Sequence, residues 1–255
     1  MSNKVIADFG NSWNITEKDL QISYCNHEFE REFIGIRKPL ELEMVFPTIA
    51  FTILSAAQNT PKLVKVFSKL KKYELLNHEN ILEPRNIEKT YKILKGTRFP
   101  NTKIRRFTNL PLWWGKEESK RLLGNIIEDI QYGGKNSLEL RNELAGKGPL
   151  GVSNKAASFV IQLLTEDTKD VKVVTVDTHM TKFLKDMGYT NKKGEEIKIP
   201  DGRKVSGMSK GDYLKYEKNI MNEAERFGLG PGELQYALWC KKTGIVYGTC
   251  LKNYF

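Results

Sequence analysis

The chain has 255 residues, enough for one large domain or two small ones. Hydrophobic residues make up 40% of it and charged residues 28%, which is the balance of a soluble globular protein. No apolar run approaches the roughly 20 residues that cross a membrane, and the N-terminus lacks the apolar core and cleavage site of a signal peptide. Three scattered cysteines argue against a disulfide framework or an iron–sulfur cluster. We therefore expect an intracellular protein, cytoplasmic or associated with the nucleoid, without a membrane partner.

The formal net charge is +10, from 41 Lys and Arg residues against 31 Asp and Glu residues. Such an excess attracts polyanions, because each phosphate that the protein neutralises releases counterions. A lysine-rich solvated surface would give the same composition. Charge alone therefore makes nucleic acid a candidate partner and leaves both interpretations open.

Along the chain, residues 1–38 show no clear period. The first strong pattern is a helix at 42–57, and because it is apolar on all sides we expect it in the middle of a core. Pro61 then opens a second helix with lysines on its outer face and an apolar inner face formed by Leu63, Val64, Val66, Phe67 and Leu70. Further helices are predicted at about 86–95, 117–131 and 136–145, the last with cap residues at 136–139.

A glycine-bearing hairpin at 146–151 separates the last of these helices from the next one. That helix shows an apolar stripe formed by Ala156, Phe159, Val160, Leu163 and Leu164. A helix at 178–187, an exposed excursion at 190–210 and a final helix at about 233–242 complete the pattern. The sequence predicts a mostly α fold.

Lys155 and Asp177 carry the strongest chemical signal. Glycines at 148 and 151 allow backbone N–H groups to approach a phosphate closely, and Ser153 suits the N-cap of the following helix. Lys155 then falls in the first turn, where the helix dipole disfavours a cation and so favours the neutral, nucleophilic amine. Asp177 closes a short β-branched run. A solvated surface lysine and a simple helix cap are the alternative interpretations of these two residues.

These segments resemble the helix–hairpin–helix DNA glycosylase superfamily. The resemblance lies in GVSNKAASFVIQLL (151–164) followed by VDTHM (176–180). It is closest to the lysine-bearing branch that includes the 8-oxoguanine DNA glycosylase/lyases. ILSAAQNTPKLVKVF (53–67) is similar to that family's early helix and DNA-inserting turn, and PGELQYALW (231–239) is similar to its late base-contacting helix.

The resemblance implies roles for individual residues. Lys155 would attack C1′ of the nucleotide and form a Schiff base. Asp177 would help to activate the lysine and would stabilise oxocarbenium-like charge. His179 would contact a phosphate near the flipped nucleotide, and Gln58 would fill the gap that the extruded base leaves.

The resemblance also implies a pocket for the damaged base. Gln235 and Trp239 would hold the base, and their four-residue spacing places them on one face of a helix, which suits hydrogen bonding plus stacking. A core position is the alternative for Trp239. Phe159, one turn after Lys155, would stack on the base or narrow the pocket. Ser153 stands where the family has a second hairpin glycine, so the detailed phosphate geometry departs from the pattern.

The predicted architecture is two α-helical subdomains with a DNA-binding cleft between them. The central bundle would span 40–164, with the helix–hairpin–helix motif at about 137–164. Residues 1–39 and 165–255 would form the second subdomain.

The implied activity is that of a monomeric base-excision-repair enzyme acting on double-stranded DNA that contains a damaged base. It would excise 8-oxoguanine and then cleave the strand by β-elimination. No redox cofactor or catalytic metal is implied, and a structural monovalent cation on the hairpin carbonyls is left open. The alternatives are a glycosylase/lyase for oxidised pyrimidines and a non-catalytic helix–hairpin–helix module, which would need neither Lys155 nor Asp177.

Overall fold

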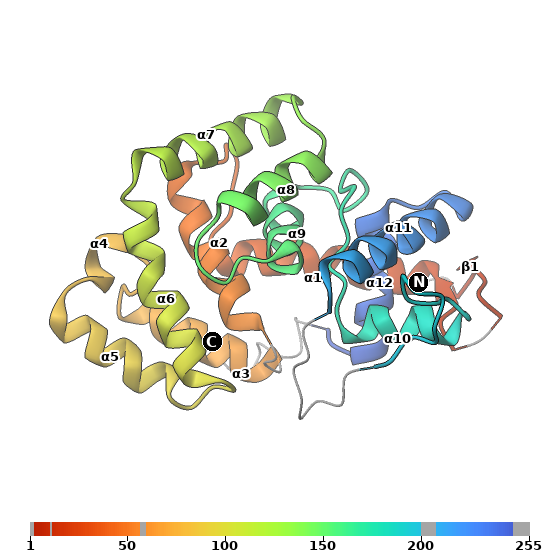
Figure 1. Cartoon of the computed structure of the whole chain (residues 1–255), viewed down its shortest axis with the longest axis horizontal. Helices are drawn as coiled ribbons and strands as arrows, with labels where there is room; N and C mark the ends of the chain where they lie inside the picture. The colour runs from red at the N-terminus through yellow and green to blue at the C-terminus, as the bar shows by residue number, and fades with distance from the viewer. Residues whose placement is uncertain (1–2, 11, 57–59, 200–207, 247–255) are drawn as a thin grey trace. The chain divides into compact units, whose positions relative to one another are not determined.

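The structure, a computed structural model, describes residues 3–10, 12–56, 60–199 and 208–246. Its regular elements are almost all helices (Figure 1). A two-stranded antiparallel sheet pairs β1 (Val5–Ala7) with β2 (Ile15–Thr16). The helices of the described part are α1 (Glu17–Ile34), α2 (Leu42–Ser55), α3 (Thr60–Lys72), α4 (His78–Ile81), α5 (Pro84–Leu94), α6 (Pro100–Trp114), α7 (Glu117–Tyr132), α8 (Ser137–Lys147), α9 (Asn154–Leu164), α10 (Thr178–Asp186), α11 (Lys210–Arg226) and α12 (Pro231–Thr243). The predicted mostly α fold is confirmed.

The chain divides into two compact units. Unit 1 contains the described residues of Met1–Glu30 and Thr165–Leu251, and unit 2 contains those of Arg31–Leu164. Helix α1 begins in unit 1 and its last turn belongs to unit 2. Within the described residues, no helix is long and apolar enough to cross a membrane.

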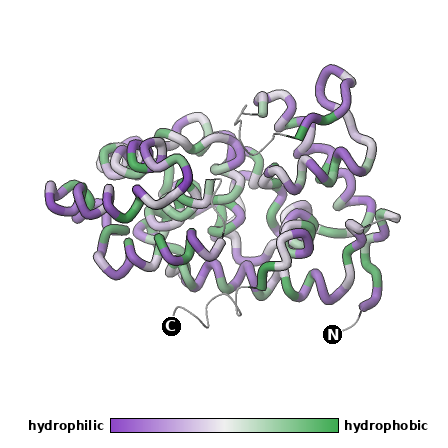
Figure 2. The backbone as a smooth tube through the Cα atoms, turned by 90° about the horizontal axis from the view of Figure 1, so that it is seen from below, coloured by the Kyte–Doolittle hydropathy of each residue, from purple (hydrophilic) through white to green (hydrophobic). Residues whose placement is uncertain are grey.

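Unit 2 is built around α2. Every residue from Met44 to Leu54 except Pro47 is buried, as expected of a helix that is apolar on all sides. Helix α2 packs against α3, α6, α7 and α9. Helix α3 buries the predicted face formed by Leu63, Val64, Val66, Phe67 and Leu70, and its lysines are exposed. Figure 2 shows the resulting alternation of hydrophobic and hydrophilic residues along the helices.

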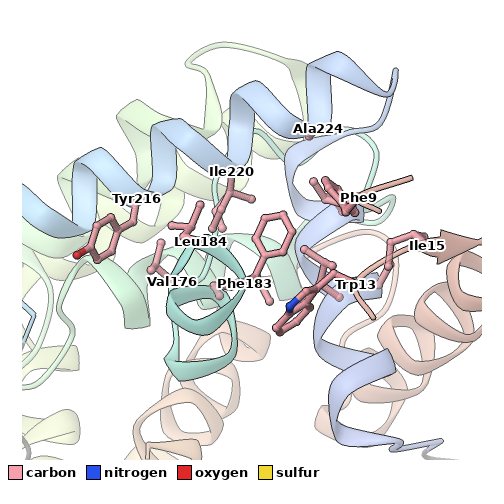
Figure 3. Packing of buried hydrophobic residues seen from close by; sticks show 14 of the residues in the cluster. Phe9, Trp13, Ile15, Val176, Phe183, Leu184, Tyr216, Ile220 and Ala224 are labelled. Atoms are coloured by element: carbon pink, nitrogen blue, oxygen red, sulfur yellow. The ribbon is translucent and has the colours of Figure 1, made fainter. Parts of the chain in front are cut away.

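The core of unit 1 joins the N-terminal segment to α10, α11 and α12 (Figure 3). Phe183 of α10 is fully buried, with its ring centroid 5.0 Å from that of Phe9 and 5.5 Å from that of Trp13, both edge to face. The Trp13 indole N–H donates to Oδ2 of Asp186 at 2.9 Å. Residues from the two ends of the chain therefore complete one hydrophobic core.

Helix α1 was not predicted, and its buried face explains why. Four of the residues on that face are polar but at most 3% exposed: Ser23, Asn26, His27 and Glu30. A hydrophobic period cannot reveal a helix whose inner face is polar. The available signal was the capping pattern at Thr16 and Asp19, since the Asp19 backbone N–H donates to Thr16 Oγ1 and Thr16 N–H donates to the Asp19 carboxylate.

Helices α4, α6 and α11 were also not predicted. Helix α4 is a single short turn of four residues. Helix α6 contains Pro111 and buries Lys103, two features that weaken a helical pattern. Helix α11 buries Glu217 and Glu223 among its apolar residues, so its inner face is again partly polar. In the predicted excursion at 190–210, an isolated bridge pairs Thr190 with Glu196, and residues 200–207 lie outside the described part.

The capping box of α8 gives a testable stability contribution. Asn136 Oδ1 accepts from the N–H groups of Leu138 at 3.0 Å and Glu139 at 3.1 Å, and the Glu139 carboxylate accepts from Asn136 N–H. Asn136→Ala should therefore lower the free energy of unfolding by about 1 kcal/mol, measured by urea denaturation. Asn136→Asp retains an acceptor and is the control. An equal loss of unfolding free energy in the two variants would show that the Asn136 cap is not the source of the stability.

Candidate catalytic site

The hairpin between α8 and α9 depends on two glycines. At Gly148, the C-cap residue directly after α8, a Cβ atom would lie 2.2 Å from the Leu144 carbonyl oxygen. Gly151 has a φ of +95°, in the third position of a turn that Val152 N–H closes on the Pro149 carbonyl at 3.1 Å. Only glycine adopts that conformation without strain. Both predicted glycines are therefore required by the backbone itself.

The start of α9 presents unoccupied hydrogen-bond donors. Among the described residues, no acceptor meets the backbone N–H groups of Gly151, Ser153 and Asn154. Ala157 N–H donates to the Ser153 carbonyl at 2.8 Å, which places Ser153 just before the first helical residue, at the predicted N-cap. Donors at a helix N-terminus suit an anion such as a DNA phosphate, because the helix dipole adds to their attraction.

Lys155 is the second residue of α9 and is exposed, so its amine is accessible. Phe159 follows one turn later and is half-buried. Its ring centroid lies 6.2 Å from that of Phe51 in α2, which belongs to an aromatic cluster with Phe33 and Phe67. The packing of Phe159 against this cluster anchors the first turns of α9, and with them the backbone of Lys155.

Lys103 of α6 is a buried lysine that the sequence pattern did not single out. Burial, together with the charges of Lys62 and Arg98, lowers the pKa of Lys103 to about 8. A lower pKa produces more neutral amine, which is the nucleophilic form. However, Lys103 is only 2% exposed, whereas Lys155 is exposed to solvent.

Asp177 is the N-cap of α10. Its Oδ1 accepts from the backbone N–H groups of His179 at 2.8 Å and Met180 at 2.9 Å. Among the described residues, no donor meets Oδ2, so one carboxylate oxygen holds the cap while the other can accept a proton or face a positive charge. His179 contributes its N–H to the same cap and is half-buried. The capping interpretation of Asp177 is thus correct and is compatible with a chemical role.

The extended segment before Asp177 is held by buried side chains of α11. The Tyr213 hydroxyl donates to the Val174 carbonyl at 2.7 Å and accepts from Val176 N–H at 3.5 Å. Glu217 Oε1 accepts from Val174 N–H at 3.2 Å. Tyr213 is 5% exposed and Glu217 is 2% exposed. These bonds take the place of the neighbouring strand that an extended segment would have in a sheet.

Gln235 and Trp239 lie one turn apart on α12, as the spacing predicted. Gln235 is 4% exposed, and its Oε1 accepts from Thr175 N–H at 3.4 Å, in the same extended segment. Trp239 is half-buried against the core of unit 1, with its ring centroid 6.0 Å from that of Tyr236. Gln235 therefore has a structural contact in addition to any role toward a base.

The predicted site residues fall into two groups. Unit 1 holds Asp177, His179, Gln235 and Trp239, whereas unit 2 holds Gly148, Gly151, Ser153, Lys155 and Phe159. Gln58 lies outside the described residues.

Solved structures of 8-oxoguanine glycosylases share this fold. One is the Methanocaldococcus jannaschii 8-oxoguanine glycosylase/lyase in complex with a 15mer DNA containing 8-oxoguanine, with a TM-score of 0.60, 20% identity and coverage of 87% of this chain and 91% of that chain. A second is the 8-oxoguanine DNA glycosylase of the same organism, with a TM-score of 0.58 and 20% identity. The match covers 90% of this chain and 87% of that chain. The third is the 8-oxoguanine DNA glycosylase of Thermotoga maritima, with a TM-score of 0.58 and 22% identity. The match covers 90% of this chain and 96% of that chain. No family model and no curated protein sequence matches the chain.

Proposed function

We propose that this chain is a bifunctional DNA glycosylase/AP lyase that excises 8-oxoguanine from double-stranded DNA. The observation that carries the proposal is the exposed Lys155 in the first turn after the hairpin, within a fold that 8-oxoguanine glycosylases share. A helix–hairpin–helix module that only bound phosphate would need the glycines and the free N–H groups but not an accessible amine at this place. The accessible amine of Lys155 therefore favours an enzyme over a binding module.

Lys155 would act as the nucleophile. Its neutral amine would attack C1′ of the flipped nucleotide, and the C1′–N9 bond would break with its electron pair leaving on the base, which takes up a proton. Loss of the amine proton and opening of the sugar would give a Schiff base between Lys155 and C1′. Removal of a proton from C2′ would then expel the 3′ phosphate by β-elimination, and water would release the lysine.

Asp177 would supply the negative charge that this reaction needs. With Oδ1 fixed by the α10 cap, its other oxygen would accept a proton from the lysine and would stabilise positive charge that develops on the sugar. This chemistry requires no redox cofactor or catalytic metal, because amine, carboxylate and water supply the nucleophile and all proton transfers. The hairpin carbonyls stay candidate ligands for a structural monovalent cation.

DNA would be held by the hairpin and around the flipped nucleotide. The N–H groups of Gly151 and Ser153 would contact a phosphate, and His179 would contact another. Gln58 would fill the gap in the duplex. The net charge of +10 suits this partner, because contacts to phosphates supply most of the affinity for undamaged DNA.

The preference for 8-oxoguanine is tested by comparing two lesions in otherwise identical duplexes. Trp239 offers a π face large enough for a purine, and the Gln235 amide offers hydrogen-bonding groups, so both favour a purine lesion. Single-turnover excision of 8-oxoguanine should be faster than that of thymine glycol. Faster excision of thymine glycol would make the chain a glycosylase/lyase for oxidised pyrimidines, with the roles of Lys155 and Asp177 unchanged. Excision of neither lesion would contradict the proposal.

A further inference from the structure

The extended segment that leads to Asp177 has an unusual support. Among the described residues, no strand pairs with this segment, so its backbone N–H and C=O groups need other partners once buried. The hydroxyl of Tyr213 bonds to backbone groups on both sides of Thr175, and the carboxylate of Glu217 bonds to the N–H of Val174. Two side chains of α11 therefore hold the segment around Val174 and Val176, and Gln235 of α12 adds a bond to the N–H of Thr175.

We propose that Tyr213 and Glu217 are positioning residues that place the Asp177 carboxylate for base excision. The proposal rests on the proposed function, since it assumes that Asp177 acts in the chemistry. Val176 is the residue directly before Asp177, so a shift of the Val176 backbone moves the carboxylate with it. Downstream, the same carboxylate is tied to α10 by its cap hydrogen bonds. Asp177 is therefore fixed from both sides, with Tyr213 and Glu217 as the upstream anchor.

Burial strengthens this anchor. A hydrogen bond that is removed from water leaves unsatisfied groups if one partner is lost, so the segment must shift or admit water. Catalytic groups are sensitive to such shifts, since a misplacement of about 1 Å can reduce a rate by about a hundredfold. Loss of the Tyr213 hydroxyl should therefore affect chemistry more than DNA binding.

Tyr216 provides a matched control on the same helix. It is 5% exposed, like Tyr213, and packs in the same core (Figure 3). No hydrogen bond joins its hydroxyl to any described residue of the segment. Tyr216→Phe therefore removes a tyrosine hydroxyl from the same helix without releasing the segment before Asp177.

The first test compares Tyr213→Phe with Tyr216→Phe in single-turnover excision of 8-oxoguanine at saturating enzyme. We expect Tyr213→Phe to slow excision by about tenfold with unchanged affinity for lesion DNA, and Tyr216→Phe to keep the wild-type rate. Glu217→Gln keeps an acceptor for Val174 N–H and should retain most of the rate, whereas Glu217→Met should lose it. Equal rates for the two tyrosine variants, or for the two Glu217 variants, would overturn the proposal.

The second test separates positioning from general destabilisation. In an Asp177→Asn background, Tyr213→Phe should produce no further loss of rate, because the group that it positions has already lost its charge. If the double variant were slowed by the product of the two single-variant factors, Tyr213 would act independently of Asp177, and the proposal would fail. The single variant Asp177→Asn tests the role of Asp177 separately. Unchanged excision by that variant would contradict the role proposed for Asp177.

Discussion

Asp177→Asn should slow base excision by at least about a hundredfold, the scale seen when a group that stabilises transition-state charge is removed. Asparagine keeps an oxygen that can accept from His179 N–H and Met180 N–H, so α10 should remain capped. What is lost is the negative charge. Affinity for lesion DNA should hold or rise, because removing a carboxylate near phosphate reduces repulsion. Single-turnover excision and equilibrium binding of the same duplex measure the two effects separately.

Asp170 supplies the control for this variant. It is exposed and belongs to the same unit, so Asp170→Asn removes the same charge without touching the α10 cap. It should excise 8-oxoguanine at the wild-type rate. A near-normal rate for Asp177→Asn, or an equal loss in Asp170→Asn, would rule out the role assigned to Asp177.

Lys155→Gln should abolish strand cleavage at the lesion and slow excision by at least about a thousandfold, the scale expected when a nucleophile is lost. Glutamine keeps most of the length and the polarity of the exposed side chain but has no nucleophilic amine, so the fold should persist. Lys147→Gln is the matched control, because Lys147 is also exposed and ends α8 just before the hairpin. Product strands are quantified on denaturing gels. Cleavage by Lys155→Gln at the level of Lys147→Gln would contradict the assignment.

The helices that carry the hairpin, Lys155 and Asp177 were predictable because their signals are local. The capping box at Asn136 fixes the start of α8, the apolar stripe defines α9, and Asp177 marks the start of α10. Helices α1 and α11 were missed because polar residues such as Glu30 and Glu217 occupy their buried faces. A hydrophobic period assumes an apolar inner face, so it fails wherever buried polar groups are satisfied by tertiary hydrogen bonds.

In the candidate site, too, some residues are recognisable from local sequence, whereas others depend on tertiary contacts. Lys155 and Asp177 could be proposed as site residues from a few neighbouring residues. The contacts of Tyr213 with Val174 and Val176 join residues 37 to 39 positions apart, and no spacing rule links them. The burial of Lys103 likewise follows from tertiary packing and not from its own segment. Residues that position or tune a site are therefore visible only once the fold is known.

Borohydride trapping tests the central claim most directly, because only a Schiff base between protein and sugar is reduced to a stable cross-link. The wild-type chain and Lys147→Gln should each form a covalent complex with a duplex that contains 8-oxoguanine. Peptide mass spectrometry should place the link on Lys155, and Lys155→Gln should form none. Undiminished trapping by Lys155→Gln, or a link on another lysine such as Lys103, would show that Lys155 is not the nucleophile.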